Sequence, residues 1–537
     1  MSFVDHIFHV LRSSSPRDIV VEHGEKGVRT TSRAKMLELI ASSRSALSKS
    51  GVMRGDRVAI LGKNSSRWIA IDLAILSEGA IVVPLYARQS PEELVAIAKD
   101  AGVKLLCVQT RELGDAIWAL WPEAPIVGFR ELFDAPARSA APTARRPDDV
   151  ATIVYTSGTS GTSKGAMITY DALDFMLPQT SSALSELMSQ AGGEDVVYHY
   201  LPMCFMGSRL VVWTCLFRDN AIHLGSEPER ILAEVGMVQP HYFLNVPVLL
   251  ERFKSGVDDA MAARGGPVAA LYTRAVSGGG KRGSVPDRIV SALAERVLYP
   301  KIRARFGGNL RFLICGSAAL RPDVSTWFER IGIPVYQVYG LTETTGIVTM
   351  DRPQGGKTGT VGFPLPRVEL KLGEGDELLV RGPNLFTGYW NRPKESAAAF
   401  SAGWFRTGDQ ATIGPDGRLA ILGRTKNILV LSSGHNVAPE PIEQRLAALI
   451  PGLVDAIVVG HARPHLVILL TGEVDEPAIK AGIDQLNDEL PHYQRVRAWQ
   501  HRRTPLSDAE GLLTANGKPR RTAIEDHFKA EIDRMYP

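Results

Sequence analysis

The strongest local signal in the sequence is TIVYTSGTSGTSKGAMITY, residues 152–170. Its apolar start is typical of a buried strand, which leads directly into a run of threonine, serine and glycine that ends at Lys164 and Gly165. Glycines let backbone N–H groups converge, hydroxyls add donors and the lysine adds positive charge, so the run predicts a cradle for phosphate oxygens. A plain flexible loop is the alternative, and the strand in front of the run favours the cradle.

The order of residues in this run excludes a Walker A phosphate loop. That motif, GxxxxGK[ST], places glycine before the lysine and Ser or Thr after it. Lys164 instead lies between Ser163 and Gly165, so we expect a different kind of phosphate cradle. Its candidate contacts are Thr156, Ser157, Gly158, Thr159, Ser160 and Lys164.

On the N-terminal side of the run, strand-like and helix-like segments alternate. Residues 56–62 predict a short buried strand, and residues 68–80 predict a helix that ends at a glycine. Ser90 is the expected N-cap of the next helix, with Pro91 at its first position. Alternation at this spacing indicates parallel βαβ units and hence an α/β fold.

Changes in composition suggest how the chain is divided. Residues 135–149, rich in Ala, Pro and Arg, and residues 277–287 are predicted to be loose connections. After about Gly423, a helical PEPIEQRLAALI and strand-like stretches such as AIVVGHARPHLVILLTGE predict a small α+β module. We therefore expect a large N-terminal domain of stacked βαβ subdomains over residues 1–424 and a small mobile C-terminal domain over residues 425–537.

Composition restricts the class of protein. Of 537 residues, 45% are hydrophobic and 22% are charged, which excludes a disordered or fibrous chain. The 61 Lys and Arg residues balance 58 Asp and Glu residues, and the formal charge of +3 gives no reason to expect a nucleic-acid partner. The most apolar stretch, residues 69–86, falls short of the roughly 20 apolar residues of a membrane span, so no transmembrane segment is expected. Contact with a membrane surface and the oligomeric state are left open.

The cysteines and the N-terminus bear on the cellular compartment. Cys107, Cys204, Cys215 and Cys315 are far apart in the sequence, in apolar surroundings, and none has the spacing of a zinc site. We expect them to be reduced thiols of the core. The N-terminal MSFVDHIFHVLRSSSP is too polar for a signal peptide, so a cytoplasmic protein is predicted.

The phosphate run resembles that of the adenylate-forming (AMP-binding) superfamily, which includes acyl-CoA synthetases, luciferases and the adenylation domains of peptide synthetases. Four more segments match motifs of that family in the same order: YGLTE at 339–343, WFRTGD at 404–409, the hinge motif GRTKN at 423–427 and TANGK at 514–518. The resemblance covers nearly the whole chain, and residues 83–94, 301–320 and 436–443 look like the long-chain fatty acyl-CoA synthetase branch. Phe205 departs from this pattern, because close relatives usually have a histidine there, near the acyl site.

The resemblance implies that ATP and Mg²⁺ convert a carboxylic acid into an acyl-adenylate. Two anions must meet in that reaction, so the site has to supply positive charge. Lys518 matches the family's lysine that bridges the substrate carboxylate and the α-phosphate, Thr342 is expected to donate its hydroxyl to the same phosphate, and Glu343 is the expected Mg²⁺ ligand. Asp409 is suited to accept both ribose hydroxyls of AMP, and Arg424 is expected to contact ribose or phosphate. Tyr339 would stack on adenine, and the backbone of Gly316, Ser317 and Ala318 would line the opposite wall. Gly340 is a further expected ATP contact.

The resemblance also implies a second step, in which the C-terminal domain rotates about Lys426 and brings the segment around Gly434 to the CoA side. Positions that match acyl-pocket walls in the family include Phe205, Tyr242 and Val246. The expected function is synthesis of an acyl-CoA from a medium- or long-chain fatty acid, with AMP and pyrophosphate as products.

Two alternatives remain open. The first keeps the adenylation and changes the acceptor to an amine, a carrier-protein thiol or an intramolecular hydroxyl that closes a β-lactone; Phe205 leaves room for this. The second is a non-catalytic nucleotide-binding scaffold. The joint presence of Lys518, Glu343, Asp409 and Arg424 argues against a scaffold, which has no need to keep all four chemical types.

Overall fold

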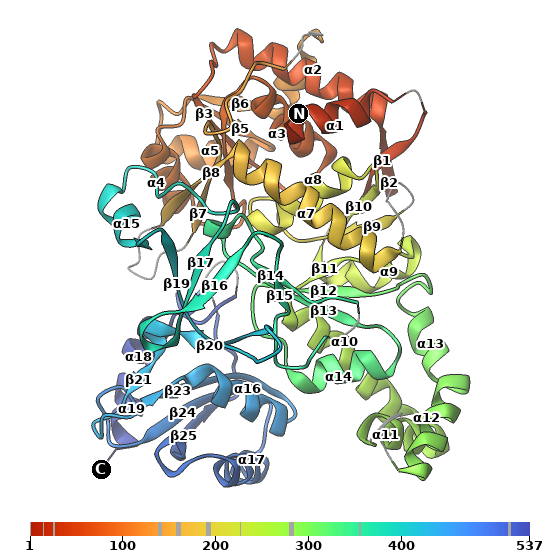
Figure 1. The fold of residues 1–537 in the computed structure, drawn as a ribbon, viewed down its shortest axis with the longest axis vertical. Coiled ribbons are helices and arrows are strands. Elements are labelled where there is room, and N and C mark those ends of the chain that lie inside the picture. The colour runs from red at the N-terminus through yellow and green to blue at the C-terminus, as the bar shows by residue number, and fades with distance from the viewer. Residues whose placement is uncertain are drawn as a thin grey trace. The chain divides into compact units, whose positions relative to one another are not determined.

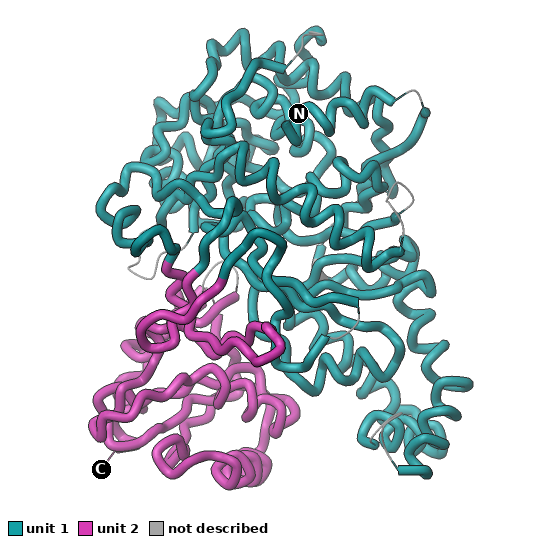
Figure 2. The backbone as a smooth tube through the Cα atoms, viewed as in Figure 1, with its two compact units in different colours: residues 1–369, 380–405 teal, residues 370–379, 406–537 magenta. Residues whose placement is uncertain are grey.

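The structure is a computed structural model. It describes residues 2–13, 15–24, 27–137, 142–156, 163–189, 195–225, 227–278, 284–353, 356–507, 509–513 and 517–536. The chain divides into two compact units (Figure 2): unit 1 is Met1–Glu369 with Val380–Phe405, and unit 2 is Leu370–Leu379 with Arg406–Pro537. The mixture of sheets and helices confirms the predicted α/β class. The limits of these units differ from the domain boundary that we expect between residues 424 and 425. That boundary stays a prediction.

The first sheet of unit 1 has six strands in the order β6-β5-β3-β4-β7-β8. Neighbouring strands are parallel except β7 and β8, which are antiparallel. The strands are β3 (Arg57–Leu61), β4 (Ile81–Leu85), β5 (Leu105–Val108), β6 (Ile126–Gly128), β7 (Val150–Thr156) and β8 (Lys164–Thr169). Nearly every residue of β3 and β4 is buried, as expected for a parallel sheet covered on both faces.

Side-chain caps fix the ends of the helices between these strands. Helix α3 (Ser66–Ser77) begins after Ser65, whose hydroxyl accepts a hydrogen bond from the backbone of the first turn. Helix α4 (Pro91–Ala101) is capped in the same way by Ser90 and ends at Gly102 in the left-handed conformation. These helices and β3 confirm the elements expected from the sequence.

Two further sheets complete unit 1, in the orders β2-β1-β10-β9 and β11-β12-β13-β14-β15. Their strands are β1 (Asp18–Gly24), β2 (Gly27–Ser32), β9 (Val196–His199), β10 (Ala221–Leu224), β11 (Leu244–Asn245), β12 (Leu313–Cys315), β13 (Val335–Tyr339), β14 (Thr349–Met350) and β15 (Phe363–Pro364). A parallel bridge between Val197 and Tyr242 links β9 to the segment that enters β11. Strands β9, β11, β12 and β13 are therefore parallel neighbours, and their carboxyl ends meet at one edge, where open α/β sheets bind ligands.

The other helices of unit 1 pack around these sheets (Figure 1). They are α1 (Phe3–Leu11), α2 (Arg33–Lys49), α5 (Arg111–Leu120), α6 (Phe129–Asp134), α7 (Tyr170–Met188), α8 (Met206–Phe217), α9 (Ile231–Val238), α10 (Pro247–Arg264), α11 (Gly266–Ser277), α12 (Val285–Val297), α13 (Tyr299–Ala304), α14 (Pro322–Arg330) and α15 (Pro393–Ala398), with single turns η1 (Pro228–Arg230) and η3 (Thr342–Thr344). The expectation that residues 277–287 form a loose connection was wrong for residues 285–287, which are helical. Helix α12 already begins at Val285, because Ser284 and Asp287 form a capping box.

The division between the units falls inside β16 (Glu369–Leu372), β17 (Glu377–Arg381) and β19 (Trp404–Ile413). The other short elements here are η4 (Glu374–Asp376) and, in unit 1, β18 (Phe400–Ser401). Within unit 2, β19 pairs antiparallel with β20 (Leu419–Arg424), which aligns Asp409 with Arg424. This hairpin places two of the predicted site residues side by side.

The rest of unit 2 is the expected α+β module. Its sheet has the order β23-β24-β25, and its apolar core lies between that sheet and the helices. Its elements are η5 (Thr425–Asn427), β21 (Leu429–Val430), β22 (Asn436–Val437), α16 (Pro439–Leu449), β23 (Leu453–Val459), β24 (Leu466–Gly472), α17 (Glu476–Glu489), η6 (His492–Gln494), β25 (Val496–Arg502), α18 (Arg521–His527) and α19 (Lys529–Arg534). The strand-like stretch AIVVGHARPHLVILLTGE belongs to two antiparallel strands, β23 and β24, joined by a turn.

Candidate active site

The predicted phosphate cradle lies in the connection between β7 and β8. Thr156 at the end of β7 and Lys164 at the start of β8 are facing partners in the antiparallel register. The other predicted contacts, Ser157, Gly158, Thr159 and Ser160, lie outside the described residues. The structure therefore fixes the two ends of the cradle, and its phosphate contacts stay a prediction.

Tyr389 contacts both Lys164 and Glu343, although Glu343 lies 179 positions after Lys164 in the sequence. The Nζ atom of Lys164 lies 5.5 Å from the centroid of the Tyr389 ring, and the Tyr389 hydroxyl donates a hydrogen bond of 2.9 Å to Oε1 of Glu343. The backbone holds the same arrangement, because the N–H of Phe386 donates to the carbonyl of Glu343 and the N–H of Trp390 donates to that of Gly165, both at 2.8 Å. The sequence analysis missed Tyr389, and the aromatic run FTGYW at 386–390 was the only local signal for it.

A tight turn after β13 positions Thr342 and Glu343. A Cβ at Gly340 would lie 2.3 Å from the carbonyl oxygen of Gly346, so only glycine allows the chain to fold back here. The Thr344 hydroxyl accepts a hydrogen bond of 2.9 Å from the N–H of Leu341 and closes the turn η3. Glu343 is thereby presented from a rigid turn at the carboxyl end of a strand.

The predicted adenine walls come from neighbouring strand ends. Gly316, Ser317 and Ala318 follow β12, and Tyr339 ends β13, its parallel neighbour. A Cβ at Gly316 would lie 2.8 Å from Cγ2 of Val338, so the two strand ends approach as closely as glycine permits. Ser317 has φ +72°, a strained left-handed conformation that costs about 1 kcal/mol or more and clusters at functional sites.

The predicted acyl-pocket residues occupy separate positions: Phe205 follows β9 and Val246 follows β11, whereas Tyr242 lies before β11. Phe205 directly precedes α8 and packs on Tyr86, with ring centroids 5.3 Å apart. Val246 directly precedes α10. Tyr242 is buried, and its ring stacks on Phe312 with a centroid separation of 5.1 Å. Whether these three side chains contact an acyl group stays a prediction.

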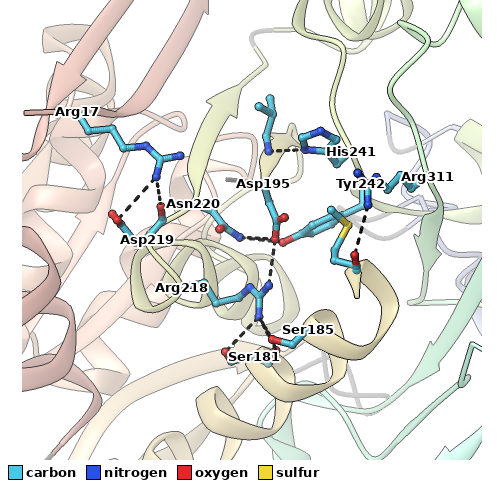
Figure 3. Close-up of polar contacts among 12 residues, drawn as sticks. Arg17, Ser181, Ser185, Asp195, Arg218, Asp219, Asn220, His241, Tyr242 and Arg311 are labelled. Atoms are coloured by element: carbon cyan, nitrogen blue, oxygen red, sulfur yellow. Dashed lines mark hydrogen bonds and ion pairs between the residues drawn. The ribbon is translucent and has the colours of Figure 1, made fainter. Parts of the chain in front are cut away.

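A buried polar network fixes the hydroxyl of Tyr242 (Figure 3). Nδ2 of Asn220 lies 3.2 Å from that hydroxyl and 3.0 Å from Oδ2 of Asp195, which also pairs with Arg218 at 3.1 Å. Arg218 and Asp195 are fully buried, and such a pair is stable only when its remaining hydrogen bonds are made. Nη1 of Arg218 donates to the carbonyl of Ser181 and to the hydroxyl of Ser185 of α7, whereas its buried Nε has no partner among the described residues. We interpret this network, which the sequence did not reveal, as structural support beneath Tyr242.

Unit 2 brings three predicted site residues together. Nε of Arg424 lies 2.8 Å from Oδ1 of Asp409, and Nη1 of Arg424 donates to the carbonyl of Thr407 at 3.1 Å. Lys518 is exposed as a residue, and desolvation of its ammonium group together with the nearby Arg424 charge lowers its pKa, while Asp409 opposes that change. The ammonium of Lys518 therefore lies within electrostatic reach of both partners. The motif residues 514–516 lie outside the described part of the chain.

The predicted hinge and CoA-side residues lie in exposed turns. Lys426 is in η5, between the site hairpin and the α+β module. Gly434 lies between β21 and β22 with φ +84°, and a Cβ there would meet no described atom within 4 Å. Both positions are compatible with their predicted roles, which the structure leaves as predictions.

The residues present fit a magnesium ion held mainly by substrate. Among the described residues, no group of three or more His, Cys, Asp or Glu side chains could hold a metal ion. Glu343 offers a single carboxylate fixed by Tyr389, and Mg²⁺ in nucleotide sites is commonly bound by one or two carboxylates plus phosphate oxygens. Mg²⁺ therefore stays a prediction that this donor set can satisfy.

Two global expectations can also be compared with the structure. Among the described helices, none combines the length and apolar character that crossing a bilayer requires. All four cysteines are buried and free, as expected for core thiols. Burial alone raises the pKa of the Cys107 thiol well above its usual range.

Comparison with known proteins identifies the family. Residues 11–390 match the family described as AMP-binding enzyme, and residues 426–537 match the AMP-binding enzyme C-terminal domain. The chain belongs to the AMP-binding enzyme family. It is 29% identical over 538 residues to a long-chain-fatty-acid–CoA ligase of Mycobacterium bovis, covering 90% of this chain and 89% of the relative. It is 28% identical to long chain acyl-CoA synthetase 3 of Arabidopsis thaliana, covering 90% and 84%.

Solved structures share the fold over nearly the whole chain. ATP-bound MatB from Rhodopseudomonas palustris has a TM-score of 0.77 at 24% identity, covering 98% of this chain and 99% of that one. The anthranilate CoA ligase AuaEII in complex with anthranoyl-AMP has a TM-score of 0.79 at 19% identity, covering 99% and 98%. At these identities the likeness establishes the fold, and it confirms the predicted architecture.

Proposed function

We propose that this protein is an AMP-forming acid–thiol ligase. It activates a medium- or long-chain fatty acid with ATP and Mg²⁺, and then transfers the acyl group to CoA. The observation that carries the proposal is the grouping of Lys518, Asp409 and Arg424 in unit 2, which provides an ammonium, a ribose acceptor and a guanidinium in one place. These are the groups that a reaction between a carboxylate and a nucleotide requires.

In the first step, the substrate carboxylate attacks the α-phosphate and pyrophosphate leaves. Lys518 lies between the carboxylate and the α-phosphate and offsets the negative charge that both carry. The Thr342 hydroxyl donates to an oxygen of the same phosphate. Losing the Lys518 ammonium is expected to slow adenylation by on the order of 10²–10³.

Individual residues have separate roles in nucleotide binding. Asp409 accepts hydrogen bonds from the ribose hydroxyls, and Arg424 keeps that carboxylate oriented through the 2.8 Å ion pair. Tyr339 stacks on adenine against the strained backbone at Ser317. Glu343 would hold Mg²⁺, which supplies positive charge to the phosphates when it is bound.

In the second step, the C-terminal module turns about Lys426, removes Lys518 from the nucleotide and brings the turn at Gly434 to the CoA thiol. A thiol with a pKa of about 8.5 is only a few per cent thiolate at pH 7, so reactivity has to come from the activated acyl group. The described residues offer no obvious dedicated base.

The choice of a fatty acid is supported by two relatives at 28–29% identity, one named a long-chain-fatty-acid–CoA ligase and the other a long chain acyl-CoA synthetase. The proposal includes a cytoplasmic location, which is favoured by four buried thiols that remain free.

A panel of carboxylic acids, scored for pyrophosphate release with and without CoA, tests the proposal. Wild-type protein should release pyrophosphate with fatty acids and form the thioester only when CoA is present. Lys518→Ala should lose adenylation, whereas Lys529→Ala, which removes another exposed lysine of unit 2, should not. Pyrophosphate release without a thioester product would contradict CoA as acceptor and direct attention to an amine, a carrier thiol or an internal hydroxyl. If wild type and Lys518→Ala both show no turnover, the result would support a non-catalytic nucleotide-binding scaffold.

A further inference from the structure

The parallel strands β9, β11, β12 and β13 carry two neighbouring rows of side chains near their carboxyl ends. The first row is apolar, and the row closer to the carboxyl ends is more polar. Tyr198, Phe243, Leu313 and Val335 belong to one buried core, in which Tyr198 packs edge-on against Phe243 at 5.7 Å and Leu313 is the register partner of Val335. Because side chains two residues apart share a face of a strand, the next row towards the carboxyl ends follows directly. That row, the edge row, consists of Tyr200, Asn245, Cys315 and Gln337.

Asn245, Cys315 and Gln337 are buried and Tyr200 is half-buried, and two polar atoms of the edge row make no hydrogen bond to the described protein. Nε2 of Gln337 donates to the carbonyl of Thr360 at 2.9 Å, and Nδ2 of Asn245 donates to that of Phe243 at 3.1 Å. Within the described part of the chain, however, the buried Oδ1 of Asn245 and the buried hydroxyl of Tyr200 make no hydrogen bond. Asn245 is only 1% exposed. Buried polar atoms are normally paired, and each exception needs an explanation.

The surroundings of the edge row are also polar. The Tyr200 hydroxyl faces the backbone of Val246 and lies near the thiol of Cys315. Glu251, one turn into α10, acts on Cys315 as well. Burial raises the pKa of Glu251, and Arg321 opposes that effect. An apolar lining suited only to a hydrocarbon chain would contain none of these groups.

The edge row adjoins the residues that the proposed function uses. The carbonyl of Asn245 accepts a hydrogen bond of 3.2 Å from the N–H of Gly316, the first residue of the predicted adenine wall. Val246, a predicted acyl-pocket residue, is the next residue after Asn245. The edge row is therefore next to residues that are expected to line the nucleotide and acyl sites.

We infer that the acyl site is built for a carboxylic acid that carries a hydroxyl group, bound by Oδ1 of Asn245 and the hydroxyl of Tyr200. A hydroxyl donates one hydrogen bond and accepts others, so it satisfies the amide oxygen and the phenol together. A ketone only accepts, so it leaves the amide oxygen of Asn245 unpaired, and an ammonium only donates, so it leaves the O–H donor of Tyr200 without an acceptor. The inference rests on the proposed function and narrows its substrate class.

The test compares acids of equal chain length in the wild-type protein. Pyrophosphate release is measured with decanoic acid, with 2-, 3- and 10-hydroxydecanoic acids and with 3-oxodecanoic acid. One hydroxy acid should exceed decanoic acid in kcat/KM by on the order of 10- to 100-fold, because an analogue without the hydroxyl leaves buried groups unpaired. The oxo acid should not share this advantage.

Variants assign the effect to the edge row. Tyr200→Phe and Asn245→Ala should lower the ratio of kcat/KM for the preferred hydroxy acid to kcat/KM for decanoic acid towards one. Tyr336→Phe, in the adjacent β13 register position on the opposite face, should keep the preference. Equal rates with decanoic acid and every hydroxy acid, or an unchanged preference in both edge-row variants, would overturn the inference alone. Failure to activate any acid would instead contradict the proposed function.

Discussion

At the scale of single residues, several side chains of the site are kept in position by hydrogen bonds or ion pairs with neighbouring side chains. Tyr389 contacts Lys164 through its ring and Glu343 through its hydroxyl, and Arg424 orients Asp409. The sequence motifs pointed to Lys164, Glu343, Asp409 and Arg424, because each lies inside a recognisable pattern. Tyr389 could not be predicted, since its role depends on a tertiary contact across 46 positions. The unpaired atoms of the edge row were equally invisible before the strand register was known.

Tyr389→Phe tests the support of Glu343. The variant keeps the ring over Lys164 and removes the hydrogen bond to the carboxylate, so the Mg²⁺ concentration for half-maximal adenylation should rise by on the order of 10-fold. The half-maximal concentration is measured by titrating Mg²⁺ at saturating acid, and Mg²⁺-dependent nucleotide binding is measured without turnover. Tyr336→Phe is the control. Identical Mg²⁺ curves for Tyr389→Phe and wild type would show that the hydrogen bond does not position Glu343.

The lowered pKa of Lys518 gives a pH dependence with a definite sign. Desolvation and Arg424 favour the neutral amine, so the ammonium is lost at a lower pH than in a free lysine, and adenylation should decline as pH rises through that lowered value. Lys518→Arg keeps its charge to higher pH. It should be slower near neutrality, and its alkaline decline should move to higher pH in a pyrophosphate-exchange profile. If the exchange rates of wild type and Lys518→Arg fell over the same alkaline pH range, the decline could not be assigned to Lys518.

At the scale of elements, strand ends and tight turns place the chemistry. The alternating patterns predicted β3, α3 and α4, because their caps and apolar runs are local. The start of α12 was predicted poorly, because its capping box has the composition of a loop. The joining of β9 to β11 through the Val197–Tyr242 bridge required the structure, since neither residue carries a pattern that marks such a pairing.

Gly340→Ala tests the turn that carries Glu343. The added Cβ would lie 2.3 Å from a backbone carbonyl, so the variant should lose on the order of 2 kcal/mol of unfolding free energy and most adenylation activity. Gly256→Ala in α10 is the matched control. Nothing lies within 4 Å of its Cβ, and replacing a helical glycine should leave stability equal or about 0.5–1 kcal/mol higher. Denaturant unfolding measures both, and equal stability of the two variants would contradict the argument.

The end of β9 should make stability depend on pH. Burial lowers the pKa of His199 to about 4, and its Nε2 lies 2.7 Å from the Ser208 hydroxyl. Below about pH 6.5 the unfolded chain binds a proton that the folded chain does not, so stability should fall by about 3 kcal/mol as pH drops from 6.5 to 4. His199→Gln should flatten this decline. His223, whose pKa burial also lowers to about 4, contributes with the same sign and remains in the variant. A slope unchanged by the substitution would exclude His199 as a cause.

At the scale of the whole molecule, the two units divide the chemistry between them. Unit 1 holds the ends of the phosphate cradle, the Glu343 turn and the edge row, while unit 2 holds Lys518, Asp409 and Arg424. The order of motifs predicted both sets of residues and the α/β architecture. Chain order could not predict which residues form each compact unit, because the division falls within β16, β17 and β19.

The central claim is that the Lys518 ammonium serves adenylation and has no part in the transfer to CoA. The most direct test measures two half-reactions separately in Lys518→Ala. The first assay is pyrophosphate exchange driven by fatty acid, and the second is thioester formation from a chemically prepared acyl-adenylate and CoA. We predict that exchange falls by on the order of 10²–10³ while thioester formation stays near the wild-type rate. Exchange at the wild-type rate, or equal loss of both half-reactions in a folded variant, would contradict the account.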